Sequence, residues 1–234
     1  MKYNILTVAN EDYKHFIKLF INSLFENCDM ENIENVYVFD TGLSQETVDY
    51  LGDFPKVVVR QTDIDAKSDQ IHDEGWKTNT YSKTKFLLSI LQQDRIPTFM
   101  IDSDCIFVEN FEDLIDWESD FVVCKRNRKG FSKYIGSFFG AIHISAACTF
   151  IAEWIFNIDF LQKNTKMKQC ESPALVKTCE APGYKIQELE EQVISAVWPT
   201  EKSRIYHLKS DHYALTVEQR INLPHARPFN RRYL

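Results

Sequence analysis

Residues 97–110, PTFMIDSDCIFVEN, constrain the fold of this chain more than any other stretch. The apolar run 98–101 is too short for a buried helix and favours a central β-strand. Because alternate residues of an extended chain point the same way, Asp102 and Asp104 are expected to project together. Two such carboxylates repel each other, and a bound cation would relieve that repulsion. An acidic turn with solvated carboxylates explains the same pattern equally well.

The residues before this stretch alternate between predicted strands and helices. The order is strand 3–9, helix 10–27, strand 36–39, helix 44–51 and strand 56–60. It is typical of an α/β fold with a mostly parallel, Rossmann-like sheet flanked by helices. Ligands of such sheets bind beyond the carboxyl ends of the strands. Asn10 and Asp40 follow predicted strands, as Asp102 and Asp104 do, so four polar groups are expected at one edge.

A further helix is predicted from Asn79 to Gln93, after a polar loop over residues 61–79. Lys83 and Lys85 would lie in its first two turns, where the helix dipole disfavours cations. A phosphate bound at the helix N-terminus would reverse that preference. Two solvated lysines on an exposed face remain the alternative.

The second half of the chain is predicted to alternate less regularly. We expect strands at 121–124, 137–144 and 204–207, and helices at 151–161 and 188–197. Gly136 and Gly140 indicate close approach of the backbone to a ligand or a neighbouring strand.

Charge and composition exclude several classes of protein. The 27 basic and 34 acidic residues give a net charge of −7, which argues against general nucleic-acid binding. The N-terminus does not read as a signal peptide, and no apolar run approaches the roughly 20 residues of a membrane span. The six cysteines form no CxxC pair, which favours a reducing, cytoplasmic location. The tail 225–234 is basic through Arg227, Arg231 and Arg232, and we expect it to cover a ligand or to contact a membrane surface peripherally.

Four further segments, together with the Asp-x-Asp strand end, carry a family resemblance. They are TYSKTKF (80–86), GSFFGAIHIS (136–145), LEEQVIS (189–195) and YHLKSDH (206–212). In order and spacing they resemble the GT-A fold glycosyltransferases, the nucleotide-diphospho-sugar transferase superfamily, and within it the glycogenin and lipopolysaccharide galactosyltransferase branch. Three residues depart from that branch: Phe139 stands in place of Asn, Ser210 in place of Gly, and Glu191 in place of Asp.

The resemblance implies a single GT-A domain over 1–234, with a nucleotide-sugar-binding half at 1–110 and an acceptor-binding half at 111–234. It implies a metal-dependent hexosyltransferase that moves a sugar from a UDP-sugar or another nucleotide-diphosphate sugar to a glycan or protein acceptor. Asp102, Asp104 and His207 are the implied metal ligands. A histidine ligand favours Mn²⁺ over Mg²⁺. The implied donor-binding residues are Ala9, Asn10, Tyr13, Asp40, Tyr81, Lys83, Asp102, Ser103 and Lys209.

The catalytic group is predicted near the acidic segment that ends at Gln192. An inverting enzyme needs a carboxylate base, for which Glu191 (or Glu190) is the candidate. A retaining enzyme would use Gln192 or the leaving phosphate to shield an oxocarbenium-like transition state. An acidic helix N-terminus stabilised by the helix dipole explains the same residues without catalysis.

Two other functions stay open. One is a nucleotide-sugar-binding module without catalysis, and the other is a sugar-1-phosphate nucleotidyltransferase. The second usually has a glycine-rich loop after the first strand, and VANEDYKH (8–15) contains no glycine. A haloacid-dehalogenase-type phosphatase is rejected, because Ile106 occupies the position of its threonine and about a hundred residues precede the acidic pair.

Overall fold

The computed structural model describes residues 1–66, 73–195 and 200–208. A seven-stranded sheet runs through the molecule in the order β3-β2-β1-β4-β7-β6-β8. Its strands are β1 Tyr3–Ala9, β2 Ile33–Asp40, β3 Val57–Gln61, β4 Thr98–Ile101, β6 Phe121–Lys125, β7 Tyr134–Ala141 and β8 Ile186–Glu190. The first four strands are mutually parallel, and β7 is antiparallel to both of its neighbours. The predicted α/β fold with a mostly parallel sheet is confirmed.

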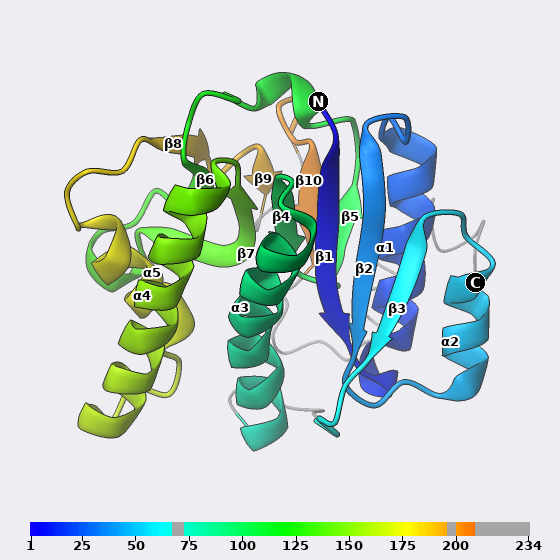
Figure 1. Ribbon diagram of the computed structural model, residues 1–234, viewed down its shortest axis with the longest axis horizontal. Helices are drawn as coiled ribbons and strands as arrows, with labels where there is room; N and C mark the ends of the chain where they lie inside the picture. The colour runs from blue at the N-terminus through cyan, green and yellow to red at the C-terminus, as the bar shows by residue number, and fades with distance from the viewer. Residues whose placement is uncertain (67–72, 196–199, 209–234) are drawn as a thin grey trace.

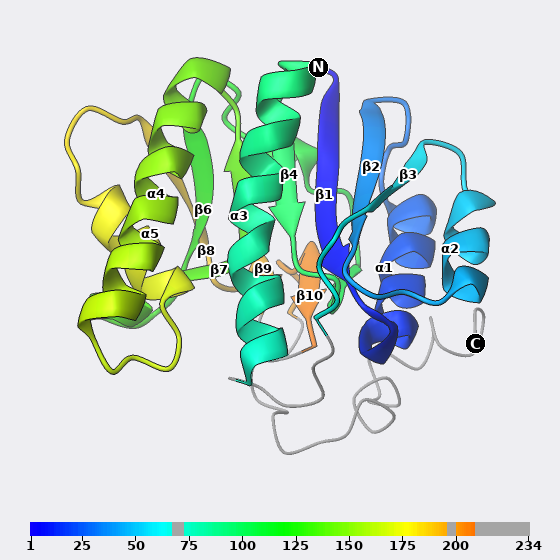
Figure 2. The ribbon, with the colours of Figure 1, turned by 60° about the horizontal axis from the view of Figure 1, so that its bottom comes forward.

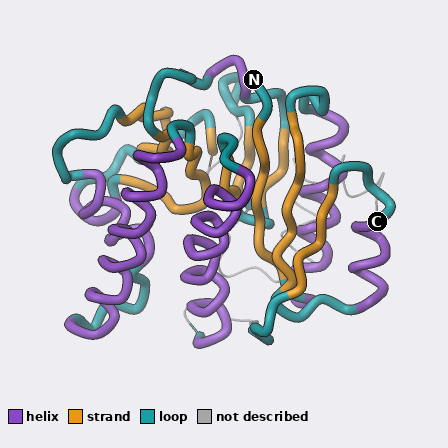
Figure 3. The backbone as a smooth tube through the Cα atoms, viewed as in Figure 1, coloured by secondary structure: helices purple, strands orange, loops and turns teal. Residues whose placement is uncertain are grey.

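Helices cover both faces of this sheet (Figure 1). The α-helices are α1 Lys14–Asn27, α2 Gln45–Gly52, α3 Glu74–Asp94, α4 Ile144–Asn164 and α5 Glu171–Cys179. Short 3₁₀ turns lie at Glu11–Tyr13, Glu112–Leu114 and Gly130–Ser132. The tube in Figure 3 shows α3 and α4 in front of the strands and α1 and α2 on the other side. The sheet is therefore the middle layer of a three-layer sandwich.

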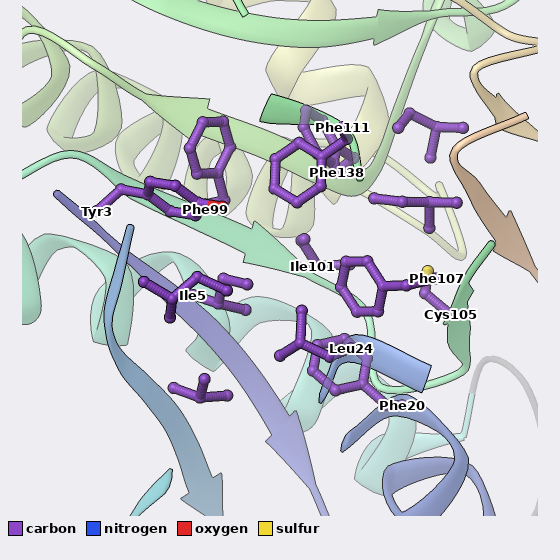
Figure 4. Close-up of a cluster of buried hydrophobic side chains, with 14 of the residues drawn as sticks. Tyr3, Ile5, Phe20, Leu24, Phe99, Ile101, Cys105, Phe107, Phe111 and Phe138 are labelled. Carbon is purple, nitrogen blue, oxygen red and sulfur yellow. The ribbon is translucent and has the colours of Figure 1, made fainter. Parts of the chain in front are cut away.

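The alternation along β1 explains why the sheet is apolar on both faces. Tyr3 and Ile5 pack into the cluster on the α1 side, whereas Leu6 packs into the cluster on the α3 side. Figure 4 shows the first cluster, in which Phe111 and Phe138 meet edge to face with ring centroids 5.9 Å apart. Strands buried on both faces in this way read as short apolar runs, which is why the first three strands are recognisable in the sequence.

A second, three-stranded sheet joins distant parts of the chain. It consists of β5 Cys105–Phe107, β10 Ile205–His207 and β9 Ile194–Ser195, in the order β5-β10-β9. The central strand β10 runs antiparallel to β5, with His207 opposite Cys105. This pairing brings the late histidine beside the acidic pair. Figure 2 shows β10 near the carboxyl ends of β1 and β4.

The helix predicted from Asn79 begins five residues earlier, at Glu74. Asp73 caps it by accepting a hydrogen bond from the backbone N–H of Trp76 at 2.6 Å. Lys83 therefore lies in the third turn, and the argument from the N-terminal dipole does not apply to it. The early turns are polar, so the apolar periodicity that predicts helices begins only near Phe86.

The helix predicted at 188–197 is wrong. Residues 186–190 form the edge strand β8, which pairs in parallel with β6, and a turn then leads into β9. Within β8, Leu189 is the one buried residue, and Glu188 and Glu190 are exposed. Edge strands often carry exposed charges, so the glutamates fit this position without a helix. The alternative of an acidic helix N-terminus is thereby excluded.

The remaining differences are shifts in element boundaries. The strand predicted at 137–144 is β7, three residues earlier, and the helix predicted at 151–161 is the longer α4. By length and composition α4 is apolar enough to cross a membrane, with a mean hydropathy of 1.4 over its best window. Phe150 and Trp154 of this helix are fully buried in the core cluster on the α3 side. The helix is thus a packed part of the fold described here.

Candidate functional site

A cleft opens at the carboxyl edge of the sheet, next to β1 and β4. The residues that line it come from six segments of the chain: Val8, Ala9, Asn10, Tyr13, Trp76, Asn79, Thr80, Lys83, Asp102, Ser103, Asp104, Arg126, Phe131, Ser132, Tyr134, Ile135, Gly136, Ser137, Gln169, Glu171, Ser172 and His207. Eight of the residues predicted from the sequence lie among them. The structure therefore brings most of the predicted residues together at this edge of the sheet, and their role in ligand binding stays a prediction.

Two of the predicted metal ligands, Asp104 and His207, are buried and in contact with each other. His207 Nε2 lies 3.1 Å from Asp104 Oδ1 and 3.9 Å from Asp102 Oδ2, and both Asp104 and His207 are almost fully buried. The backbone N–H of Leu208 donates to the carbonyl of Asp104 at 2.9 Å, which holds β10 against the acidic turn. Adjacent ligand atoms of a small octahedral cation are about 3 Å apart. The spacing and the mixed oxygen and nitrogen donors therefore fit a divalent ion, for which Asp104, Cys105 and His207 also form a compact group.

The carboxylate of Asp102 is held by Lys83. Lys83 Nζ donates hydrogen bonds to Asp102 Oδ1 at 2.6 Å and to the carbonyl of Gly136 at 3.0 Å. The same Nζ lies 2.7 Å from Glu171 Oε1. Burial alone would lower the pKa of Lys83, but Asp102 and Glu171 raise it above its usual value. Lys83 is therefore a permanent cation at the floor of the cleft.

Glu171 was not predicted from the sequence. It begins α5, is 3% exposed, and its carboxylate lies against the backbone of β7. A Cβ added at Gly136 would come within 2.5 Å of this carboxylate, so residue 136 has room only for glycine. The close approach predicted for the two glycines is present, and at Gly140 it is to a neighbouring strand, through the ring of Phe99 on β4. At Gly136 the neighbour is the α5 residue Glu171 rather than a strand.

Asn10 lies at the end of β1, beside Ala9 and Tyr13, as predicted. Its side-chain amide donates to the carbonyl of Ala66 at 2.6 Å, and Asn79 donates to the same oxygen at 3.1 Å. The side-chain oxygens of Asn10 and Asn79 are buried and accept no hydrogen bond from the described part of the chain. Two acceptors at the wall of the cleft can thus meet the donors of a ligand.

Two predicted donor-binding residues, Asp40 and Tyr81, are not among the residues that line this cleft. Asp40 Oδ1 accepts from the backbone N–H groups of Gly42 and Leu43, so it caps its own turn. The hydroxyl of Tyr81 accepts from the backbone N–H of Cys170 at 3.1 Å. Lys209 lies outside the described residues, as does the basic tail.

Glu191 and Gln192 line a neighbouring hollow rather than the cleft. The residues of this second hollow are Lys125, Arg126, Asn127, Glu190, Glu191, Gln192, Ser195 and Thr200. Arg126 belongs to both hollows and forms the wall between them. Glu191 Oε1 accepts from Arg126 Nε at 3.2 Å, and its Oε2 accepts from the backbone N–H of Asn127 at 3.0 Å.

Of the α3 residues that line the cleft, Lys83 was predicted from the sequence, whereas Trp76, Asn79 and Thr80 were missed although the sequence holds a signal for them. Asn79 and Thr80 lie three and four residues after Trp76, and Lys83 lies four and three residues after them, so all four share one helix face and line the cleft. The same helical stripe continues into buried apolar residues that pack on the sheet. One face of α3 thus changes from polar to apolar along its length, a pattern that hydrophobic periodicity alone does not detect.

The fold matches three solved structures of glycosyltransferases. The galactosyltransferase LgtC, in complex with donor and acceptor sugar analogues, aligns with a TM-score of 0.68 and 9% identity over 97% of this chain and 94% of that chain. An active-site mutant of LgtC aligns with a TM-score of 0.66 and 10% identity over the same shares of the two chains. The bifunctional glycosyltransferase WbbM aligns with a TM-score of 0.60 and 13% identity over 99% of this chain but 51% of that chain.

The sequence alone provides no such match. No protein-family model and no curated protein matches this chain. The likeness therefore lies in the arrangement of strands, helices and cleft rather than in residue identities. On these grounds, the chain has the fold of the GT-A glycosyltransferases.

Proposed function

We propose that this protein is a glycosyltransferase that moves a sugar from a nucleotide-diphosphate sugar to a glycan or protein acceptor, with a UDP-sugar as the favoured donor and Mn²⁺ as the favoured ion. Mg²⁺ is the alternative ion. The proposal rests on one observation above all: Asp102, Asp104 and His207 meet in a buried group at the carboxyl edge of a GT-A fold. Activity, donor and ion are proposed here on that basis.

The charge of the cleft supports the need for a cation. Among the described residues, three carboxylates line the cleft, those of Asp102, Asp104 and Glu171, against two cations, Lys83 and Arg126. Lys83 is already paired with Asp102 and Glu171. A diphosphate would meet net negative charge at this floor and would be repelled. Asp102, Asp104 and His207 are the residues that would hold a divalent ion. When bound, such an ion neutralises the charge that develops on the leaving diphosphate.

The other residues of the cleft would bind and orient the donor. Ala9 ends the first strand, Asn10 follows it and Tyr13 lies in the next 3₁₀ turn, and these three residues would frame the base and ribose. Ser103 lies between the two aspartates. Lys83 fixes one oxygen of Asp102, which leaves Asp102 Oδ2 turned toward His207. Gln192 remains our candidate for the group that faces the reacting carbon, from the second hollow.

The proposal is tested by a screen of sugar nucleotides for Mn²⁺-dependent hydrolysis, followed by transfer assays and NMR of the product anomer. We expect turnover with one donor, most readily a UDP-sugar. The substitutions Asp104→Asn and His207→Ala should each lower the rate on the order of a hundredfold or more, because each removes a proposed ligand. The anomer would decide between retention and inversion.

Asp159→Asn is the matched control, because Asp159 is an exposed carboxylate on α4 that does not line the cleft. Its rate should equal that of the wild type. Binding of donor and Mn²⁺ without turnover would instead identify a binding module. Formation of a sugar nucleotide from a sugar 1-phosphate would identify a nucleotidyltransferase. Unchanged rates in Asp104→Asn and His207→Ala would contradict the assigned site.

A further inference from the structure

Among the described residues, the cleft is lined by two cationic side chains, Lys83 and Arg126, and their surroundings differ. Lys83 has three oxygens around Nζ, those of Asp102, Glu171 and Gly136, at 2.6 to 3.0 Å. An ammonium group carries three hydrogens, so this environment matches its whole donor capacity. A phosphate that approached Lys83 would have to displace one of these oxygens. The ammonium group of Lys83 is thus already paired with protein oxygens, and it positions the carboxylate of Asp102.

Arg126 is differently placed. Its Nε donates to Glu191 Oε1 at 3.2 Å, and its side chain is 16% exposed. Its terminal Nη1 and Nη2 donate no hydrogen bond to any residue in the described ranges. A guanidinium offers five N–H donors in a planar fork, which suits the oxygens of a phosphate. Arg126 therefore still has N–H donors that a ligand can use, whereas Lys83 does not.

Glu191 gives this arginine a fixed orientation. One of its oxygens binds Nε of Arg126, and the other accepts the backbone N–H of Asn127 at 3.0 Å. Such a carboxylate restricts the side chain, so less conformational entropy is lost when a ligand binds. Because Arg126 lines both hollows, a ligand that occupies the cleft or extends into the second hollow can meet its guanidinium.

We infer that Arg126, oriented by Glu191, is the cationic side chain that binds the diphosphate of the ligand in this cleft, and that Glu191 acts through Arg126 as a positioning residue. This inference rests on the proposed function, because it takes a nucleoside diphosphate as the ligand class. It also assigns Arg126, which was not predicted from the sequence, to the donor site.

The experiment is calorimetric titration with UDP in the presence of saturating Mn²⁺, beside titration with Mn²⁺ alone. We expect Arg126→Ala to weaken UDP binding about ten- to a hundredfold, which is the effect of losing a charge-assisted hydrogen-bond pair. Binding of Mn²⁺ alone should not change. Arg126→Lys should recover part of the loss, because a lysine keeps the charge but not the fork.

Arg128→Ala is the matched control, since Arg128 is exposed and lies two residues further along the same segment. It removes the same charge and should leave UDP binding within about twofold of the wild type, as expected for an exposed charge. Equal losses in Arg126→Ala and Arg128→Ala would overturn the inference, because they would indicate only a general electrostatic effect.

A double-mutant cycle tests the role of Glu191. Glu191→Gln should weaken UDP binding severalfold in the wild type and add nothing in the Arg126→Ala background. Additive losses would show that Glu191 acts independently and would overturn its assignment as a positioning residue. If the wild type binds UDP with Mn²⁺ and Arg126→Ala binds it equally well, the inference fails alone. If the wild type does not bind UDP under any metal condition, the proposed function fails with it.

Discussion

Two charged clusters in this protein have the same arrangement with opposite signs of charge. In the cleft, the cation Lys83 lies between the carboxylates of Asp102 and Glu171. Beside β8, the carboxylate of Glu188 lies between the ammonium groups of Lys125 and Lys133, at 2.5 and 3.0 Å. Tyr134 also donates its hydroxyl proton to a hydrogen bond with Glu188. Each cluster has one central charge and two opposite ones.

Burial separates the two clusters. The side chains of Lys83 and Glu171 are 7% and 5% exposed, whereas those of Lys125 and Lys133 are 48% and 38% exposed. Charges removed from water depend on their partners, because an unpaired buried charge is costly. Exposed charges are solvated and screened whether or not they are paired. The same arrangement is therefore expected to be essential to the fold in one place and nearly optional in the other.

The largest difference between the two clusters is expected when a lysine is removed from each of them. Lys83→Met would leave the carboxylates of Asp102 and Glu171, which both contact Nζ, without this counter-charge, and we expect a loss of about 3–5 kcal/mol in the free energy of unfolding. Urea denaturation measures it. Lys133→Met, at the exposed cluster, should cost less than about 1 kcal/mol. Similar losses in the two variants would show that burial does not distinguish the clusters.

A smaller effect is expected from crowding the buried cluster without changing its charges. Gly136→Ala would place a methyl group within 2.5 Å of the Glu171 carboxylate and displace it from Lys83. We expect a loss of about 1–3 kcal/mol in the free energy of unfolding, typical of overpacking. Gly52→Ala is the control, because no atom lies within 4 Å of its added Cβ, and it should not destabilise. A neutral Gly136→Ala would mean that the cluster is not tightly packed.

The contribution of the exposed cluster to the free energy of unfolding should depend on pH, because Glu188 titrates. Burial tends to raise the pKa of Glu188, but hydrogen bonds from Lys125, Tyr134 and Lys133 lower it from 4.5 to about 2. A carboxyl group with a lowered pKa in the folded state stabilises the protein above pH 4.5, and this contribution is lost as the pH falls toward 2. After allowance for screening we expect it to be about 1–2 kcal/mol.

The measurement is the free energy of unfolding of the wild type and of Glu188→Gln at pH 6 and at pH 3. The advantage of the wild type should shrink at the lower pH, because the variant carries no titrating group at this position. The other carboxyl groups titrate in both proteins and cancel in the difference. A constant difference between the two proteins would contradict the pKa assigned to Glu188.

The two halves of the chain differed in how far the sequence predicted them. Strands β1, β2 and β4 and the helices between β1 and β3 were predicted to within a few residues, because each is a short apolar run or a clear helical stripe with turn residues at its ends. In the second half, β8 was predicted as a helix. Its glutamates have no strong local preference that marks a strand, and pairing with β6 decided its structure.

The candidate site shows the same division. From the sequence alone, Asp102, Asp104 and Asn10 could be assigned to one sheet edge, since the ends of parallel strands meet there. The histidine at 207 was predicted only through a family resemblance, and the pairing of β10 with β5 places it beside Asp104. Nothing local in the sequence marked Glu171 or the role of Arg126.

The Asp-x-Asp at the end of a buried strand was thus determined by the sequence itself, because strand formation and the alternation of side chains are local properties of the chain. Only the tertiary structure decided which charges surround it. Lys83 meets Glu171, and Arg126 meets Glu191, because helices and strands distant in the chain pack on one sheet. Ion pairs of this kind follow from packing geometry, and spacing along the sequence does not encode them.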